Sequence, residues 1–396
     1  MMKPTILHSF FLTAVVPIIL VGCTTTQVVT ANSTPAIQAN SDIALDLLMD
    51  IGITPFDPNI PEAEEDLEKG FIIPDVRLAE SGYMAYHLKD TLELTGNWGA
   101  VRVTPTPTHT VDLQVSGRIL LSDGEQLKAH IWVIDATGQT WINKAYDDTA
   151  SKFSYDAIKE DPFQDLYNEI ANDILLARQR ASAATVKNIR EVSTLKFARS
   201  LSPEAFAPYL VEESGRVEIT QLPAKDDVML QRVDNIKERE YLFVDTMDDY
   251  YGRFYTDMRD SYDEWRLATY QEAILLRQLQ KQSRNRLIGG AAMVAAGIYA
   301  GTESQTYAES AASSGVVVGG IAAIKSGLDR RKSAEIHAQS LRELGQSLGG
   351  EITPYVLEIE GKTIELSGTA SGQYQQWRGL LKQIYTEETG LPTEQQ

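Results

Sequence analysis

The sequence predicts an α+β protein. We expect a two-layer α/β domain with a mainly antiparallel sheet, then a long coiled-coil-like helical region with a Gly-rich hairpin, and finally a small helix–hairpin–helix module. Apolar and polar residues alternate over much of 101–146, as in strands with one buried face. Over 224–286 apolar residues recur at spacings of three and four, as on one face of a helix. Within 329–391 this helical spacing is interrupted by two short alternating runs.

The α/β domain is expected over 43–185, beginning with a strand at 51–56. A helix should follow, with Asp75 as its N-cap and Gly96 just after its end. Aspartate accepts hydrogen bonds from free N–H groups, and glycine tolerates the left-handed conformation that often ends a helix. The next alternating runs predict an antiparallel meander. In it, Asp123-Gly124 predicts a hairpin turn, which needs positive φ.

A second helix of this domain should open at Asp161-Pro162, because proline is tolerated in a first turn. Its inner stripe is expected to be Phe163, Leu166, Ile170, Ile174 and Ala177. Residues 186–223 contain Pro203, Pro208 and Pro223 and predict a bridge with short helical pieces.

Residues 224–286 predict one long helix, because they contain no proline and Gly252 is their only glycine. If unbroken, some 60 residues would span about 90 Å; a helix hairpin bent near Gly252 is the alternative. The apolar stripe has one gap, at Glu240. Carboxylates alternate with rings over 245–265, which would suit sugar or Ca²⁺ binding. Their spacing favours a solvated helix face whose rings make a helix–helix contact.

The N-terminus has the layout of an export signal over 1–22, with Lys3 before an apolar core. That core is about eleven residues long, whereas a membrane span needs roughly 20. The protein contains a single cysteine, so an internal disulfide is excluded. Residues 24–41 are polar and small, and the segment 23–42 is expected to be a flexible tether.

The end of the signal, Leu20-Val21-Gly22-Cys23, resembles a bacterial lipobox. This resemblance implies cleavage between Gly22 and Cys23 and acylation of Cys23, with palmitate among the chains. Because Thr24 rather than aspartate follows, it also implies the outer membrane, with the body of the protein in the periplasm. An ordinary secretory signal with a chance cysteine is the alternative.

The order strand, helix, four strands, helix over roughly 43–185 resembles the periplasmic domains of the TolB N-terminal, LpoB and CsgG type. The resemblance rests on residues 51–56, 77–95, 97–103, 112–117 and 127–135, the turn Thr137-Gly138, and Trp141. Proteins of this group act as assembly factors, synthase activators or secretion rings. The resemblance therefore implies a role in an envelope assembly rather than catalysis.

A Gly-rich apolar pair is expected to form a helical hairpin over 287–328, in which small residues four apart let helix backbones approach closely. It resembles the glycine zippers of outer-membrane lipoproteins. The glycines proposed for helix packing or membrane contact are Gly289, Gly290, Gly297, Gly301, Gly315, Gly319 and Gly320. The first run, of about 15 residues, reaches only about 22 Å of a bilayer core about 30 Å thick. A packed soluble hairpin and a hairpin that contacts the bilayer both remain open.

The sequence contains no recognisable set of catalytic residues, and we expect no cofactor and no metal. The mature histidines His87, His109, His130 and His337 are not spaced as ligands. His130, in a strand beside Trp132, is expected to be a half-exposed structural residue. Ser193 and Lys196 have the Ser-x-x-Lys spacing of acyl-serine enzymes, but the other motifs of those enzymes are missing, which favours a chance match.

The net charge of −19 opposes binding to nucleic acid, which is a polyanion. We therefore expect a non-enzymatic outer-membrane lipoprotein that scaffolds or regulates an envelope assembly through protein–protein contacts. A component of a secretion ring that touches the bilayer through the Gly-rich hairpin is the alternative, and an envelope hydrolase is a third. The partner protein stays unidentified, and homo-oligomerisation stays open.

Overall fold

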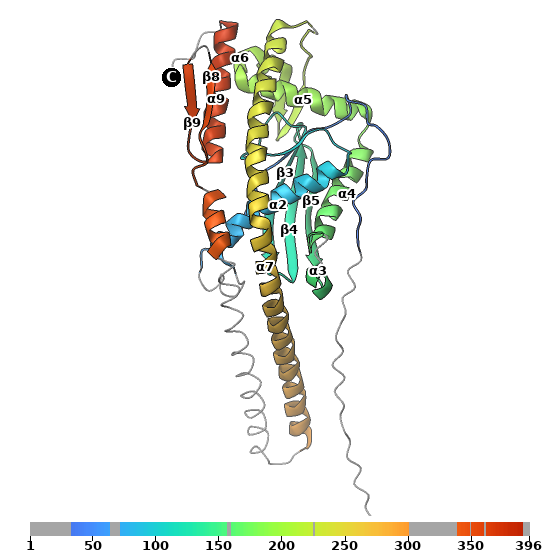
Figure 1. Ribbon diagram of the computed structural model, residues 1–396. Helices are drawn as coiled ribbons and strands as arrows, with labels where there is room; N and C mark the ends of the chain where they lie inside the picture. Colours follow the sequence, from blue (N-terminus) through green and yellow to red (C-terminus); the bar gives the residue numbers. More distant parts are fainter. Residues whose placement is uncertain are drawn as a thin grey trace, which may run out of the picture. The chain divides into compact units, whose positions relative to one another are not determined.

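The computed structural model describes residues 33–63, 72–156, 160–224, 226–300, 339–348, 350–359 and 362–390, which all belong to one unit. Its centre is a mixed sheet of five strands in the order β2-β1-β3-β4-β5 (Figure 1). The strands are β1 (Ile51–Ile53), β2 (Val101–Val103), β3 (Leu113–Ser122), β4 (Gln126–Asp135) and β5 (Thr140–Thr149). The chain is therefore an α+β protein, as the sequence predicts.

The pairing of the strands corrects the predicted meander. Strands β3, β4 and β5 are antiparallel neighbours, but β2 pairs with β1, and β1 is parallel to both β2 and β3. Strand β2 lies parallel to β1 because a helix, α2 (Pro74–Leu94), connects the two strands. A helical crossover of this kind returns the chain to the same end of the sheet, which makes the pairing parallel.

The predicted turn residues are confirmed by the backbone. Gly124 and Gly138, in the two hairpins of the meander, have φ of +79° and +84°. Gly96 follows α2 with φ of +67°, so it ends the helix as expected. The predicted N-cap is wrong: the N-cap residue is Ile73, and Asp75 lies in the first turn behind Pro74, whose missing N–H suits that position.

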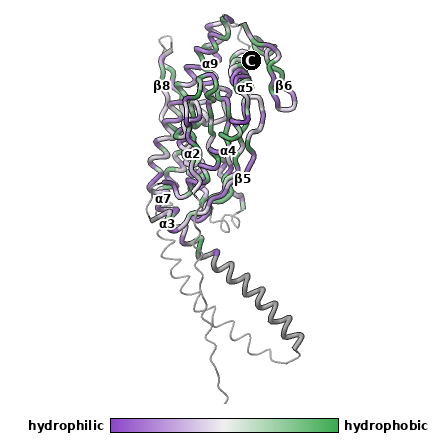
Figure 2. Tube along the Cα trace, turned by 90° about the vertical axis from the view of Figure 1, so that its right-hand side faces the viewer, coloured by the Kyte–Doolittle hydropathy of each residue, from purple (hydrophilic) through white to green (hydrophobic). Residues whose placement is uncertain are grey.

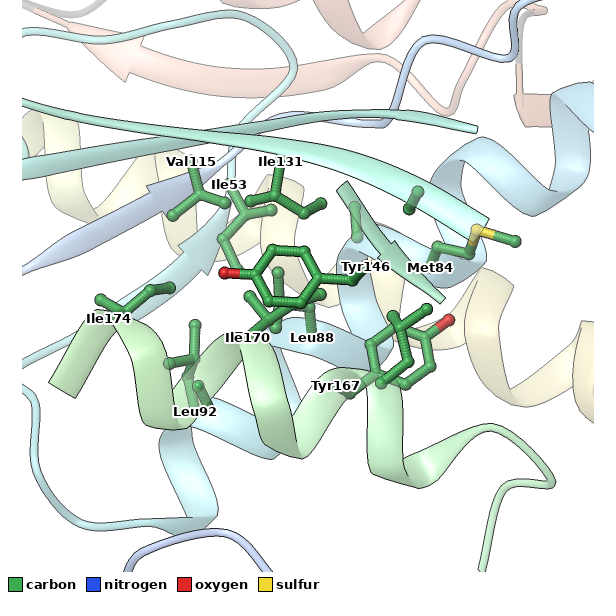
Figure 3. Packing of buried hydrophobic residues seen from close by; sticks show 14 of the residues in the cluster. Ile53, Met84, Leu88, Leu92, Val115, Ile131, Tyr146, Tyr167, Ile170 and Ile174 are labelled. Carbon is green, nitrogen blue, oxygen red and sulfur yellow. The ribbon is translucent and has the colours of Figure 1, made fainter. Parts of the chain in front are cut away.

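Helices α2 and α4 (Gln164–Arg180) pack on one face of the sheet, and a short helix, α3 (Lys152–Asp156), precedes α4. Figure 3 shows their side chains against those of the strands, with Leu88 and Ile170 facing Ile53 and Ile131. The predicted inner stripe of α4 is confirmed for its first four members and half-buried at the last, listed as Phe163, Leu166, Ile170, Ile174 and Ala177.

The predicted bridge over 186–223 contains the expected short helical pieces, but much of it belongs to a long helix and a β-hairpin. These residues comprise most of α5 (Ala183–Leu201), then α6 (Pro203–Phe206), η1 (Ala207–Tyr209), β6 (Leu210–Glu213) and β7 (Arg216–Ile219). Two of the prolines that suggested a bridge, Pro203 and Pro208, stand in first turns, where they do not break a helix, and Pro223 lies in the loop before the next helix.

Helix α7 (Val228–Ala300) is 73 residues long and passes through Gly252 without a break, as the prediction of one long helix requires and unlike the alternative of a hairpin bent there. A Cβ at Gly252 would lie 2.7 Å from Tyr86 Oη on α2. The glycine therefore serves a close approach of a neighbouring side chain. Figure 2 shows hydrophilic and hydrophobic residues alternating along the described helices, as expected of helices with one buried face.

The C-terminal elements are a helical segment at 339–348, the hairpin β8 (Tyr355–Ile359) and β9 (Lys362–Leu366), and α9 (Ala370–Thr389). These are the elements that the sequence predicts. They do not stand alone, because Trp377 and Tyr385 of α9 share one apolar cluster with Phe197 of α5 and Phe243 of α7.

The sequence predicts a flexible tether over 23–42, and for residues 33–40 this prediction is wrong. Residues 33–40 lie along α4 and the end of α2, held there by hydrogen bonds such as that from the N–H of Ile37 to Asn172 Oδ1, 2.8 Å. Residues 1–32 lie outside the described residues.

Gly345, in the 339–348 helix, should tolerate no side chain. A Cβ there would lie 2.2 Å from the backbone oxygen of Asp75. We expect Gly345→Ala to lower the free energy of unfolding by roughly 1–3 kcal/mol, as overpacking does. Gly379 of α9 has no atom within 4 Å of such a Cβ, so Gly379→Ala should stabilise by up to about 1 kcal/mol. Urea unfolding compares the two; a Gly345→Ala protein as stable as the wild type would contradict this packing.

Candidate functional site

The residues that the sequence singled out are only partly within the described structure. Gly22 and Cys23, together with Gly301, Gly315, Gly319 and Gly320, lie outside the described residues. Gly289, Gly290 and Gly297 lie within α7, so the first Gly-rich run is a helical continuation of the long helix. Among the described helices, none is both long and apolar enough to cross a membrane.

Ser193 and Lys196 lie on α5, and both have structural partners outside that helix. The hydroxyl of Ser193 donates to the backbone oxygens of His109 and Val111, at 3.1 and 3.0 Å. The ammonium of Lys196 donates to the backbone oxygen of Ala136, at 3.2 Å. Both side chains therefore tie α5 to the ends of the sheet strands.

His130 is half-buried on β4, as the sequence predicts. Its Nε2 lies 2.7 Å from Asn143 Oδ1 on β5, and its ring lies 4.3 Å from that of Trp132. Across the part of the chain that the structure describes, no group of three His, Cys, Asp or Glu side chains could hold a metal ion.

The most extensive constellation of functional groups lies along one face of α7. Seven polar or ionisable side chains of this helix bond or pair with the sheet domain, and an eighth, Lys237, interacts with it electrostatically; we call them the α7 ladder. They are Lys237, Tyr241, Asp245, Asp248, Tyr255, Tyr262, Arg266 and Arg277. Tyr241, Asp248, Tyr255 and Tyr262 are seven residues apart, which is nearly two turns and places them on one face.

The first part of the ladder meets the starts of the sheet strands. Tyr241 Oη donates to the backbone oxygen of Thr110, at 3.3 Å, and lies 3.5 Å from a carboxylate oxygen of Asp50. Burial raises the pKa of the nearby Asp112 to about 6, and the negative charge of Asp50 contributes. Burial likewise lowers the pKa of Lys237, against the attraction of Asp112.

The middle of the ladder meets β2 and α2. Asp248 accepts the N–H of Val103, at 2.7 Å, and lies 3.5 Å from Lys89 Nζ. Through this contact a side chain of α7 satisfies a backbone donor at the edge of the sheet. One heptad on, Tyr255 Oη lies 2.7 Å from Nδ1 of His87, whose Nε2 contacts Gln164 of α4, at 2.8 Å.

Arg266 is among the most deeply buried residues of the ladder, and its side chain is 1% exposed. It pairs with Asp161, at 2.9 Å, and with Asp263 one turn earlier. Burial by itself would raise the pKa of Asp161, but the Arg266 guanidinium, His87 and the hydrogen bond from the N–H of Phe163 together outweigh it. The pKa is therefore lowered and the carboxylate is held ionised. Asp161 directly precedes the first turn of α4, and the pair therefore joins α7 to α4.

Next to it, Tyr262 and Ser122 both donate to Glu80 Oε1, at 2.9 and 2.6 Å. Burial raises the pKa of Glu80, while Arg77, at 2.9 Å, opposes the rise. Farther along, Arg277 pairs with Asp123 and with Glu125 at the β3–β4 hairpin.

Glu240, the gap in the predicted apolar stripe, is fully buried against α9. It accepts from Tyr374 Oη, at 2.6 Å, and lies 3.4 Å from Arg378 Nη1. Burial raises the pKa of Glu240, and Arg378 opposes the rise. Glu240 is thus a buried ionic contact between α7 and α9. The spacing of the apolar residues alone cannot distinguish it from a residue that faces solvent.

The ladder was missed as a set, although the sequence carried a signal. For the acidic and aromatic stretch the sequence predicts a solvated face with rings at a helix–helix contact, and the rings do make one: the ring centroids of Tyr255 and Tyr262 lie 4.6 and 4.7 Å from that of Tyr83 on α2. The seven-residue recurrence of Tyr241, Asp248, Tyr255 and Tyr262 was the additional signal. Such side chains recur on one face when that face meets fixed polar partners.

Removing Arg378 should leave Glu240 buried without its cation. We expect Arg378→Met to lower the free energy of unfolding by roughly 3 kcal/mol, and the double change with Glu240→Leu to recover much of it. Arg239, in an exposed pair with Glu388 that also joins α7 to α9, is the matched control. Its change to Met should cost less than about 1 kcal/mol. Urea unfolding measures all four proteins, and equal losses in both single variants would contradict the buried contact.

The raised pKa of Asp112 predicts a pH dependence of stability. Its pKa is about 6 in the folded chain, above the roughly 3.9 of an unfolded one. The folded state therefore binds the proton more tightly, and the contribution of this group to stability falls between about pH 4 and pH 6 and is level above that.

The full decline from Asp112 is about 3 kcal/mol, at 1.4 kcal/mol per pKa unit. We expect Asp112→Asn to remove this part of the decline, seen as a smaller difference in urea stability between pH 4.5 and pH 7.5. Asp257→Asn, at an exposed position of α7, should keep the wild-type difference. If the Asp112 and Asp257 variants behave alike, Asp112 is not the group responsible.

Comparison of the chain with family models, with curated proteins and with solved structures finds no match. Its function is therefore inferred from its own sequence and from the contacts described above. The contacts are those of a long helix fixed on an α/β domain.

Proposed function

We propose that this chain is a non-enzymatic outer-membrane lipoprotein, acylated at Cys23, whose body faces the periplasm. In this role it scaffolds or regulates an envelope assembly by presenting the distal part of α7 and the Gly-rich residues to a partner. The order β1, α2, β2, β3, β4, β5, α4 agrees with the periplasmic domains that the sequence resembles, and this supports the proposal.

The observation that carries the proposal is the attachment of α7. Its ladder runs from Lys237 to Arg277, about 60 Å of helix at 1.5 Å per residue. Buried ionic pairs and apolar packing hold this length against the sheet domain and α9. A helix held over such a length moves with its domain as one body. The part of α7 that continues to Ala300 would therefore keep a fixed position relative to the domain. It would place a contact with a partner far from the sheet.

The return of the chain supports a hairpin for the Gly-rich residues. The hydroxyls of Ser261 on α7 and Ser340 lie 3.1 Å apart. The chain that leaves Ser261 along α7 therefore comes back to the same part of α7 at Ser340, as the proposed hairpin over 287–328 requires.

The alternative, a secretion-ring component that touches the bilayer, has one observation in its favour. Helix α7 continues through 287–300, a stretch without charged residues. An apolar helical stretch of this kind can contact a membrane surface, as the alternative requires, although a protein partner would also cover it. The two roles differ in what the stretch contacts, so an experiment can separate them.

The test begins with Cys23→Ser. We expect the wild type to incorporate labelled palmitate and to sediment with outer membranes, and the variant to do neither, since acyl chains provide the attachment. Thr24→Ser keeps the cysteine and should fractionate as the wild type. Absence of palmitate from the wild type would refute the lipoprotein proposal. A Cys23→Ser protein that stays on membranes through high salt would favour the bilayer-contact alternative.

A photo-crosslinking residue at position 292, compared with one at exposed position 257, identifies what the distal helix contacts in intact cells. Protein adducts specific to position 292 are expected for a scaffold. Lipid adducts there would favour the secretion-ring alternative.

A further inference from the structure

The backbone of residues 33–40, which we call the strap, is bound in an extended conformation by side chains of α4. The N–H of Thr34 donates to Asp165 Oδ1, at 2.7 Å, and the N–H of Ile37 donates to Asn172 Oδ1, at 2.8 Å. The amide of Asn172 also donates to the backbone oxygen of Pro35, at 3.0 Å. Asn172 thus satisfies a donor and an acceptor of the strap at once, as a neighbouring strand would.

The strap continues to the end of α2. The amide of Asn97 donates to the backbone oxygen of Ile37, at 2.8 Å, and the N–H of Ala39 donates to the backbone oxygen of Thr95, at 2.8 Å. All five of these bonds reach the backbone of the strap. They therefore fix its path and register without depending on its side chains.

The spacing on the two elements matches. Asp165 and Asn172 are seven residues apart on α4, about 10.5 Å along the helix axis. Thr34 and Ile37 are three residues apart, about 10 Å in an extended chain. Two turns of helix therefore present one acceptor to each of these N–H groups, with the strap running parallel to α4.

The strap is docked mainly by hydrogen bonds. Its residues are exposed or half-buried, and Ile37 is 42% exposed. No apolar side chain of the strap belongs to a buried cluster of the described residues. Exposed hydrogen bonds largely replace bonds to water, while ordering each backbone residue has an entropic cost. The net free energy of docking is therefore small, and the strap can dock and release reversibly.

We propose that the strap is a reversible clasp that sets how far the body can stand from the lipid anchor; this rests on the proposed acylation of Cys23. When it is docked, the roughly eleven residues from Cys23 to Thr34 span at most about 40 Å. When it is released, the next residue with a bond to the domain is Leu45, whose backbone oxygen accepts from Arg190, at 2.6 Å. The roughly 22 residues from Cys23 to Leu45 reach up to about 79 Å, so release doubles the reach.

The clasp is tested first on the purified Cys23→Ser chain, which needs no lipid. We expect the amides of Thr34, Ile37 and Ala39 to exchange hydrogen at least tenfold more slowly than an unstructured chain. Asn172→Ala should remove most of this protection, whereas Gln179→Ala, at an exposed position of the same helix, should keep it. Unprotected amides in the parent chain, or unchanged protection in the Asn172 variant, would overturn the proposal.

A disulfide can lock the docked position. A Cβ at Gly96 would lie 3.6 Å from Ala39 Cβ, within the range of a disulfide, and Cys23→Ser leaves no competing thiol. We expect Ala39→Cys with Gly96→Cys to oxidise readily and to restore protection in the Asn172→Ala background. The positive φ of Gly96 strains the second cysteine, so the exchange measurement stands independently of this variant.

In cells, both variants are made with Cys23 intact. The locked and released proteins should differ at least threefold in partner adducts from a photo-crosslinker at position 292, and equal yields would overturn the clasp as a control of reach. Palmitate incorporation is read in the same samples. If it is absent while the strap docks in the purified chain, the anchor proposal fails and the docking stands.

Discussion

The buried pair of Arg266 and Asp161 is the contact on which the arrangement of α7 depends. The two side chains are 1% and 3% exposed, and a charge removed from water in this way is tolerated only next to its partner. A shift of α7 by one residue would separate them and would also displace Tyr262 from Glu80. The pair therefore restricts α7 to one register and one rotation on the domain, which apolar packing alone does less strictly.

Helix α7 is the element that the apolar clusters of the described residues share. Tyr251 and Tyr270 pack against the sheet core, Val233 and Phe243 pack with α5 and α9, and Phe254 packs with α2 and the 339–348 helix. The ladder lies between these clusters. Hydrophobic burial thus contributes most of the free energy that holds α7 against its neighbours, and the polar residues of the ladder determine its position. This combination suits a helix that has to hold one orientation over a long distance.

The local features of the fold were predictable, and the reason is that they depend on neighbouring residues. The glycines at 96, 124 and 138 adopt positive φ because their turns require it, and the inner stripe of α4 follows from helical spacing. The N-cap of α2 is a local error, but the larger errors concern partners that are distant in sequence. Strand β2 pairs with β1 across the whole of α2, and residues 33–40 are held by Asp165 and Asn172, more than a hundred positions away. No local pattern contains such partners.

The sequence by itself determined the α+β class, the turn positions, the helical character of 228–286 and the absence of an internal disulfide. Each follows from backbone preference, periodicity or the count of one residue type. Only the tertiary structure decided that Glu240 is a buried ionic contact rather than a solvated gap, that the rings and carboxylates of α7 form a ladder, and that residues 33–40 are a docked strap. The physical reason is that the state of a polar side chain depends on whether a partner from elsewhere in the chain meets it.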